Sequence, residues 1–94
     1  MATARFEVYG RVQGVGFRYF AQRQALALEV RGWVRNRDDR TVEVHAAGSA
    51  KALQALEDYL RQGPPAAYVT GVSRSDWPLS PAQGAALDGF KILD

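Results

Sequence analysis

The order in which strand and helix patterns follow one another is the feature that most restricts how this chain can fold. Apolar alternation or a short apolar stretch predicts five strands, over residues 5–12, 30–36, 41–47, 67–73 and 90–93. Apolar residues spaced three and four apart predict two helices, over residues 17–28 and 49–62. The first six elements run strand, helix, strand, strand, helix, strand, which is the split βαβ pattern. We therefore predict an α+β fold, a ferredoxin-like βαββαβ sandwich whose antiparallel sheet carries two helices on one face.

Turns and loops separate these elements. Residues 37–40 form a short polar link that is typical of an antiparallel hairpin. In the fourth strand, Val69 and Val72 would face opposite sides of the sheet unless Gly71 lies at a bulge. Residues 76–89 are interrupted by Pro78, Pro81 and Gly84, so we predict a loop there and assign it no role.

Length and residue usage limit the kinds of site that the chain can hold. Its 94 residues leave room for one domain, which we expect to span residues 1–94 as a monomer. The absence of cysteine excludes disulfides and a thiol nucleophile, and it suits a cytoplasmic location. With His45 as the only histidine, neither a serine triad nor a multi-histidine metal centre can form. No long apolar run predicts a signal peptide or a membrane span.

Positive charge is concentrated in the first part of the chain. Residues 1–40 contain eight arginines against four acidic residues, whereas residues 41–94 have an excess of acidic residues. Ten of the twelve basic residues are arginines. Because the guanidinium is planar, this usage favours specific recognition of an oxyanion over a diffuse cationic surface. A small anionic ligand is therefore the first candidate.

A glycine-rich segment between the first strand and the first helix is the candidate binding site. Residues 13–18 read Gln-Gly-Val-Gly-Phe-Arg, and glycines there allow successive backbone N–H groups to converge on one anion. The helix N-terminus adds unpaired N–H groups, and Arg18 adds a guanidinium beside them. The simpler alternative is a tight turn in which Arg18 is a solvated surface charge. The spacing of the glycines matches neither the dinucleotide fingerprint nor the phosphate loop of nucleotide-binding proteins.

Two longer motifs resemble those of the acylphosphatase family. Gly-Arg-Val-Gln-Gly-Val-Gly-Phe-Arg at residues 10–18 is similar to the signature loop of that family, and Gly-Trp-Val-Arg-Asn at residues 32–36 to its second motif. Residues 63–72 and 89–92 resemble later landmarks of the family, in order and at compatible spacing. The resemblance covers nearly the whole chain.

The resemblance implies an enzyme that hydrolyses the carboxyl–phosphate bond of small acyl phosphates, with phosphate as product and inhibitor. It assigns Arg18 to phosphate binding and Asn36 to positioning the attacking water. Gln13, Gly14, Val15, Gly16 and Phe17 would complete the phosphate-binding loop. A carboxylate leaving group has a pKa of about 4 and departs without a general acid. Positioning and electrostatic stabilisation are then the main tasks, and no cofactor or metal is expected.

Other polar and aromatic residues have simpler interpretations. His45 is expected on the polar face of a strand, and Asp38 and Asp39 in a solvated turn. Trp33 and Trp77 are expected to bury area rather than to bind a ligand. Without the family resemblance, Asn36 could instead be a turn residue bonded to its own backbone.

Two functions from other classes remain as alternatives. RNA-recognition modules share this strand order, but the third strand here has no exposed aromatic residue, so no nucleic-acid partner is expected. Acylphosphatase-like domains also occur at the head of larger carbamoyl-transfer proteins, where the domain would be a carrier or regulatory module.

One departure from the family concerns the hairpin, where Arg40 occupies a position at which the family usually has glycine.

Overall fold

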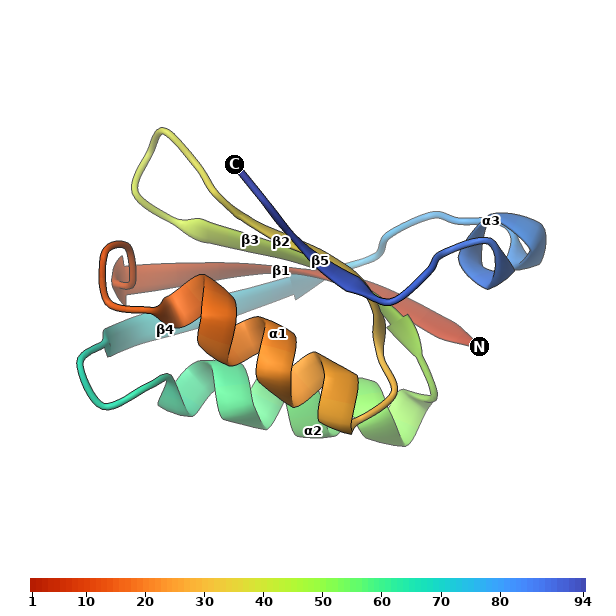
Figure 1. The fold of residues 1–94 in the computed structure, drawn as a ribbon, viewed down its shortest axis with the longest axis horizontal. Coiled ribbons are helices and arrows are strands. Elements are labelled where there is room, and N and C mark those ends of the chain that lie inside the picture. The colour runs from red at the N-terminus through yellow and green to blue at the C-terminus, as the bar shows by residue number, and fades with distance from the viewer.

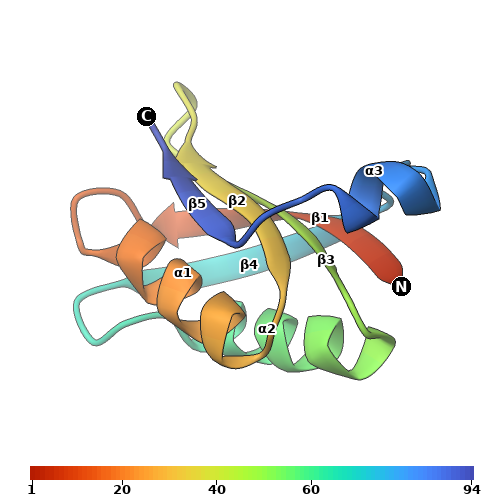
Figure 2. The ribbon, with the colours of Figure 1, turned by 45° about the vertical axis from the view of Figure 1, so that its right-hand side comes forward.

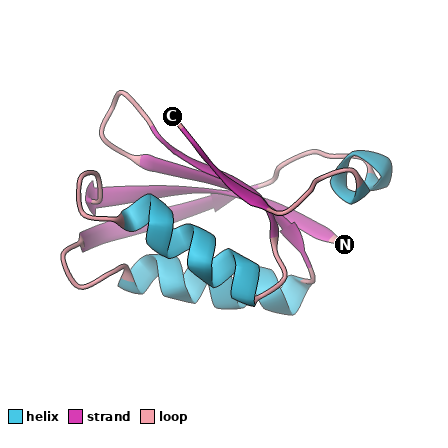
Figure 3. Cartoon of the chain, in the orientation of Figure 1, coloured by secondary structure: helices cyan, strands magenta, loops and turns pink.

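The computed structural model describes residues 1–94, except the side chain of residue 81, as a five-stranded sheet with two long helices on one face (Figures 1 and 3). The elements in chain order are β1 (Ala2–Arg11), α1 (Phe17–Ala27), β2 (Arg31–Asn36), β3 (Val42–Gly48), α2 (Ala50–Gln62), β4 (Tyr68–Ser75), α3 (Pro81–Ala85) and β5 (Phe90–Leu93). The predicted ferredoxin-like arrangement is confirmed.

The strands lie in the order β4-β1-β3-β2-β5. The pairs among the first four strands are antiparallel, as predicted. The pairing of β5 with β2 is parallel, which adds a feature that the expectation of an antiparallel sheet did not include. The chain leaves β4 at one edge of the sheet and returns through α3 to the opposite edge, where β5 runs in the direction of β2 (Figure 2).

The segment between β4 and β5 corrects one prediction. A loop was expected throughout residues 76–89, but residues 81–85 form α3. Ser80 and Gln83 make a capping box: the Ser80 hydroxyl accepts from the Gln83 N–H at 3.1 Å, and the Gln83 side chain accepts from the Ser80 N–H at 2.9 Å. Because this box satisfies two N–H groups at the helix start, a short helix forms despite the breaker-rich sequence.

The fourth strand contains a bulge next to Gly71, the position that the sequence left open for one. Tyr9 pairs with Gly71 and Gly10 with Val69, so β4 has one extra residue between these pairs. As a result, Val69 and Val72 both pack against the core.

The core lies between the helices and the sheet face that they cover (Figure 2). The sheet contributes alternate residues such as Phe6, Val8, Val34 and Val44, and the helices contribute residues at helical spacing, such as Ala21, Ala25, Leu53, Leu56 and Leu60. At Gly32 a Cβ atom would lie 1.8 Å from the carbonyl oxygen of His45, so only glycine fits at this position, where β2 pairs with β3.

The other sheet face carries a cluster around Glu43, which is only 3% exposed. Its carboxylate accepts from Arg5 Nε at 2.8 Å and from Arg35 Nε at 2.7 Å, and it lies 3.0 Å from His45 Nε2. The His45 ring stacks on Trp33 at 4.0 Å. Burial acts to raise the pKa of Glu43, but hydrogen bonds from His45, Arg35 and Arg5 outweigh it and lower the pKa to about 2. Burial lowers the pKa of His45.

Candidate active site

The β1–α1 loop and the β2–β3 hairpin lie at the same end of the sheet, opposite to α3 (Figures 1 and 2). In the loop, Gly14 and Gly16 have φ values of 74° and 78°. Gly16 is the N-cap of α1 in the left-handed conformation, so the chain turns sharply there and the N–H groups of the first helical turn face the loop. Glycines with positive φ just before a helix N-terminus are typical of loops that bind anions.

Arg18 lies in the first turn of α1 and is fixed from a second element. Its Nη1 donates to the carbonyl oxygen of Leu93 in β5 at 3.1 Å. The preceding residue, Phe17, is 1% exposed and anchors the start of the helix in the core. The start of the helix is thus fixed by the packing of Phe17, and the guanidinium is held by its hydrogen bond to Leu93.

Asn36 is the last residue of β2. It shares a sheet face with the buried Val34, which is the face that the helices cover. Its Oδ1 is buried and has no hydrogen-bond partner among the described residues. A buried acceptor without a partner costs stability, and such an atom often marks a position where a ligand or water binds. Asn36 therefore has an acceptor that no described residue uses.

Arg18 and Asn36 lie on the wall of one pocket of about 190 Å³. Its lining residues come from the loop, the start of α1 and the ends of β2 and β5: Val12, Gly14, Gly16, Phe17, Arg18, Tyr19, Asn36 and Ile92. The structure thus brings together Arg18 and Asn36, on which the sequence analysis places the chemistry. Three of the five other residues of the predicted loop, Gly14, Gly16 and Phe17, line the same pocket.

Gln13 and Val15 are not among the described residues that line this pocket. The side chain of Gln13 turns away from it, toward the β2–β3 hairpin. Its Nε2 donates to the carbonyl oxygens of Arg37 at 2.8 Å and Thr41 at 3.0 Å. Val15 is partly buried and packs against the core.

The hairpin that follows Asn36 contains the departure from the usual glycine. Arg40 has a φ of 72°, in the left-handed region where glycine is favoured. The turn is closed by hydrogen bonds from Arg40 N to Arg37 O at 3.2 Å and from Arg37 N to Thr41 O at 2.9 Å. Asp39 accepts from both the hydroxyl and the N–H of Thr41, and these bonds lower its pKa.

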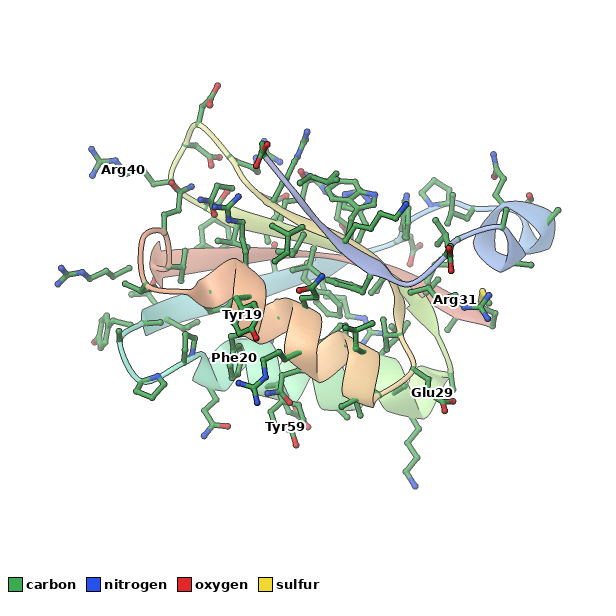
Figure 4. All side chains as sticks on the ribbon, in the orientation of Figure 1. Tyr19, Phe20, Glu29, Arg31, Arg40 and Tyr59 are labelled. Atoms are coloured by element: carbon green, nitrogen blue, oxygen red, sulfur yellow. The ribbon has the colours of Figure 1, made fainter. Side chains whose placement is uncertain are left out.

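Three residues that line the pocket, Val12, Tyr19 and Ile92, lie outside the predicted site. Val12 directly precedes the predicted loop. Tyr19 of α1 is 60% exposed (Figure 4), and both it and Ile92 of β5 line the pocket. Tyr19 could have been found, because helical spacing leaves it off the core face directly after Arg18. Ile92 could not, since its place depends on the parallel pairing of β5 with β2.

Comparison with known proteins identifies the chain. The acylphosphatase family model matches residues 4–92. The chain belongs to the acylphosphatase family. An acylphosphatase of Cupriavidus pinatubonensis is 49% identical over 84 residues, which cover 89% of this chain and 88% of the relative. The crystal structure of an acylphosphatase from Bacillus subtilis covers both chains completely, with a TM-score of 0.90 and 39% identity. HypF of T. kodakarensis matches over all of this chain and 12% of its own, with a TM-score of 0.83 and 27% identity.

The family and the fold support hydrolysis of acyl phosphates as the activity of this acylphosphatase. Among the described residues, no three histidine or acidic side chains converge as metal ligands would. No described helix is long and apolar enough to cross a membrane. His45 and the Glu43 cluster lie on the sheet face that α1 and α2 leave uncovered, and neither lines the Arg18 pocket.

Proposed function

We propose that this acylphosphatase hydrolyses acyl phosphates by in-line attack of a water molecule on a phosphoryl group bound in the pocket between the β1–α1 loop and Asn36. Arg18 and the loop amides bind the phosphoryl oxygens, and Asn36 positions the water. The observation that carries the proposal is the buried, unpartnered Oδ1 of Asn36 on the wall that it shares with Arg18.

Binding of the phosphoryl group follows from the donors that converge on the pocket. One nitrogen of Arg18 is occupied by Leu93, which leaves the remaining guanidinium donors for two phosphoryl oxygens. The N–H groups at the start of α1 and the positive end of the helix dipole serve the third oxygen. These donors are fixed before substrate arrives, so they stabilise charge in the transition state without reorganising.

Water activation requires orientation more than proton transfer. A water that donates to Asn36 Oδ1 has its lone pair directed away from that hydrogen bond, toward the phosphorus. The bond to the carboxylate breaks on the opposite side, and the departing carboxylate is stable without a proton because its conjugate acid has a pKa of about 4. The proton lost by the attacking water passes to the phosphate formed or to solvent. Neither a metal nor a cofactor is needed for these steps.

The exposed mouth of the pocket fits a small-molecule substrate. Tyr19 and Ile92 flank the opening, and they offer an apolar surface to the acyl group while the phosphoryl group is inside. Inorganic phosphate fits the same cradle and should compete with the substrate. We further propose that residues 1–94 act as one monomeric domain in the cytoplasm, with no nucleic-acid or membrane partner.

The direct test is release of phosphate from benzoyl phosphate by the purified chain. Turnover should persist in excess EDTA, and inorganic phosphate should inhibit competitively. Arg18→Ala should abolish turnover, whereas Arg61→Ala, which removes an exposed arginine of α2 that does not line the pocket, should leave it unchanged. Loss of activity in EDTA with recovery on adding a divalent ion would contradict the metal-free mechanism. Equal losses in the two arginine variants would contradict the site.

A further inference from the structure

The side chain of Gln13 connects the two segments that carry the reacting groups. It follows the buried Val12 at the start of the loop, and its amide nitrogen donates to Arg37 O and Thr41 O, 24 and 28 residues away. Arg37 is the residue directly after Asn36. Gln13 is the first residue of the loop that carries Arg18, and its amide is hydrogen-bonded to the residue that follows Asn36.

The sheet itself does not provide this connection. The register of β1 on β3 ends with the pair Val8 and Val42. Beyond that pair β1 pairs only with β4, so no strand pairing connects the loop to the hairpin. Among the described residues, the two Gln13 bonds are the only hydrogen bonds that cross from residues 12–18 to residues 36–41.

The hairpin does not need Gln13 to satisfy its own backbone. Arg37 O also accepts from Arg40 N, and Thr41 O from Arg37 N. A carbonyl oxygen has two lone pairs, so each acceptor keeps one partner if the Gln13 amide is removed. Loss of the amide therefore leaves no buried carbonyl unpaired, and the turn stays closed. What is lost is the fixed separation between the loop and the hairpin.

We propose that Gln13 is a positioning residue that holds Asn36 at its working distance from the phosphoryl group bound by Arg18. The proposal rests on the function proposed above, and it gives Gln13 a role other than contact with phosphate. Gln13 acts on kcat through Asn36, because the phosphate donors belong to the loop backbone and Arg18 and stay in place without the amide. A displacement on the order of 1 Å at such a distance lowers rate strongly.

The first measurement compares Gln13→Ala and Gln13→Glu with the parent chain on benzoyl phosphate. We expect both variants to lose roughly 10-fold or more in kcat, while the dissociation constant of inorganic phosphate changes less than about threefold. Gln13→Glu keeps the shape but places a carboxylate against two carbonyl oxygens. Because a protonated carboxyl regains one O–H donor, its kcat relative to the parent should rise as the pH is lowered, and that of Gln13→Ala should not.

Gln22→Ala is the matched control. Gln22 lies on α1 and its Nε2 donates to Phe90 O at 2.9 Å, so this variant loses the same kind of amide–carbonyl bond outside the Asn36 hairpin. Its kcat should stay within about twofold of the parent. A kcat loss in Gln22→Ala equal to that in Gln13→Ala would show a general effect of lost stability and would overturn the positioning role.

The decisive arm is a double-mutant cycle. If Gln13 acts through Asn36, Gln13→Ala should change kcat less than about twofold in an Asn36→Ala background. Multiplying losses would overturn the proposal, and so would a phosphate affinity that falls as much as kcat. If Asn36→Ala lowers kcat but the Gln13 variants do not, only this proposal fails. If Asn36→Ala itself keeps full kcat, the proposed function fails first. Hydrogen exchange without substrate separates these cases, because Gln13→Ala should speed exchange at residues 36–41 more than Gln22→Ala does.

Discussion

Replacing Arg40 by glycine should stabilise the fold. Arg40 has a φ of 72°, and a residue with a Cβ atom in this region carries a penalty of about 1–2 kcal/mol. The side chain makes no hydrogen bond or ion pair with the described residues, and it points away from the hairpin into solvent (Figure 4). Glycine removes the penalty, but it also makes the unfolded chain more flexible, which lowers the free energy of unfolding by about 0.5–1 kcal/mol. The net gain should be about 0.5–1 kcal/mol.

Urea denaturation measures this gain as a higher midpoint with an unchanged m-value. In a chain of this length, the midpoint temperature of thermal unfolding should rise by roughly 2–8 °C. Asp38→Gly is the control within the same turn, since Asp38 does not have a positive φ, and it should not stabilise. Glu29→Gly, at the other non-glycine residue with a positive φ, should stabilise in the same way as Arg40→Gly. A lower midpoint for Arg40→Gly would refute the strain argument.

The remaining predictions concern pH, packing and the guanidinium. Because the pKa of His45 is lowered in the fold, stability should begin to fall as the pH drops below the ordinary value of 6.5. Because the pKa of Glu43 is lowered from 4.5 to about 2, its contribution should be complete above pH 4.5 and lost as the pH falls through about 2. A urea midpoint that stays constant through one of these two pH ranges would contradict the assignment for that range. Gly32→Ala should destabilise by about 3 kcal/mol or more in urea denaturation, because the new Cβ would meet the His45 carbonyl, while Gly71→Ala, with open space, should change little. Arg18→Lys should recover little of the kcat lost in Arg18→Ala, since a point charge cannot replace paired donors; full recovery would mean that charge alone suffices.

The fold was predictable because each local signal agreed with the others. Alternation set the strands and helical spacing set the helices, and the hairpin link between residues 37 and 40 fixed the antiparallel pairing of β2 with β3. The sequence left the bulge in β4 open, because it did not decide whether Val69 and Val72 both face the core, as they do. The direction of β5 was not predictable, because it depends on the path of the chain through residues 76–89 rather than on its own four residues.

The candidate site was predictable to the extent that it is made of neighbouring residues. The loop, the helix N-terminus and Arg18 follow one another in sequence, so their shared geometry could be inferred. The meeting of Arg18 with Asn36 came from the family resemblance, since 18 residues and a change of element separate them. The contacts of Gln13 and the burial of Asn36 Oδ1 depend on side-chain directions set by tertiary packing, which no local pattern contains. The same is true of the Glu43 cluster, to which the three strands β1, β2 and β3 contribute on the second sheet face.

The measurement that tests the account most directly compares Asn36→Ala with Arg18→Ala in two quantities, kcat for benzoyl phosphate and the dissociation constant of inorganic phosphate by calorimetry. Asn36→Ala should bind phosphate as the parent does while kcat falls by roughly 100-fold or more, the scale of losing one positioned polar group. Arg18→Ala should lose both. Circular dichroism should show that both variants are folded. If Asn36→Ala kept its kcat, or lost phosphate affinity as severely as Arg18→Ala, the division into a phosphate-binding arginine and a water-positioning asparagine would be wrong.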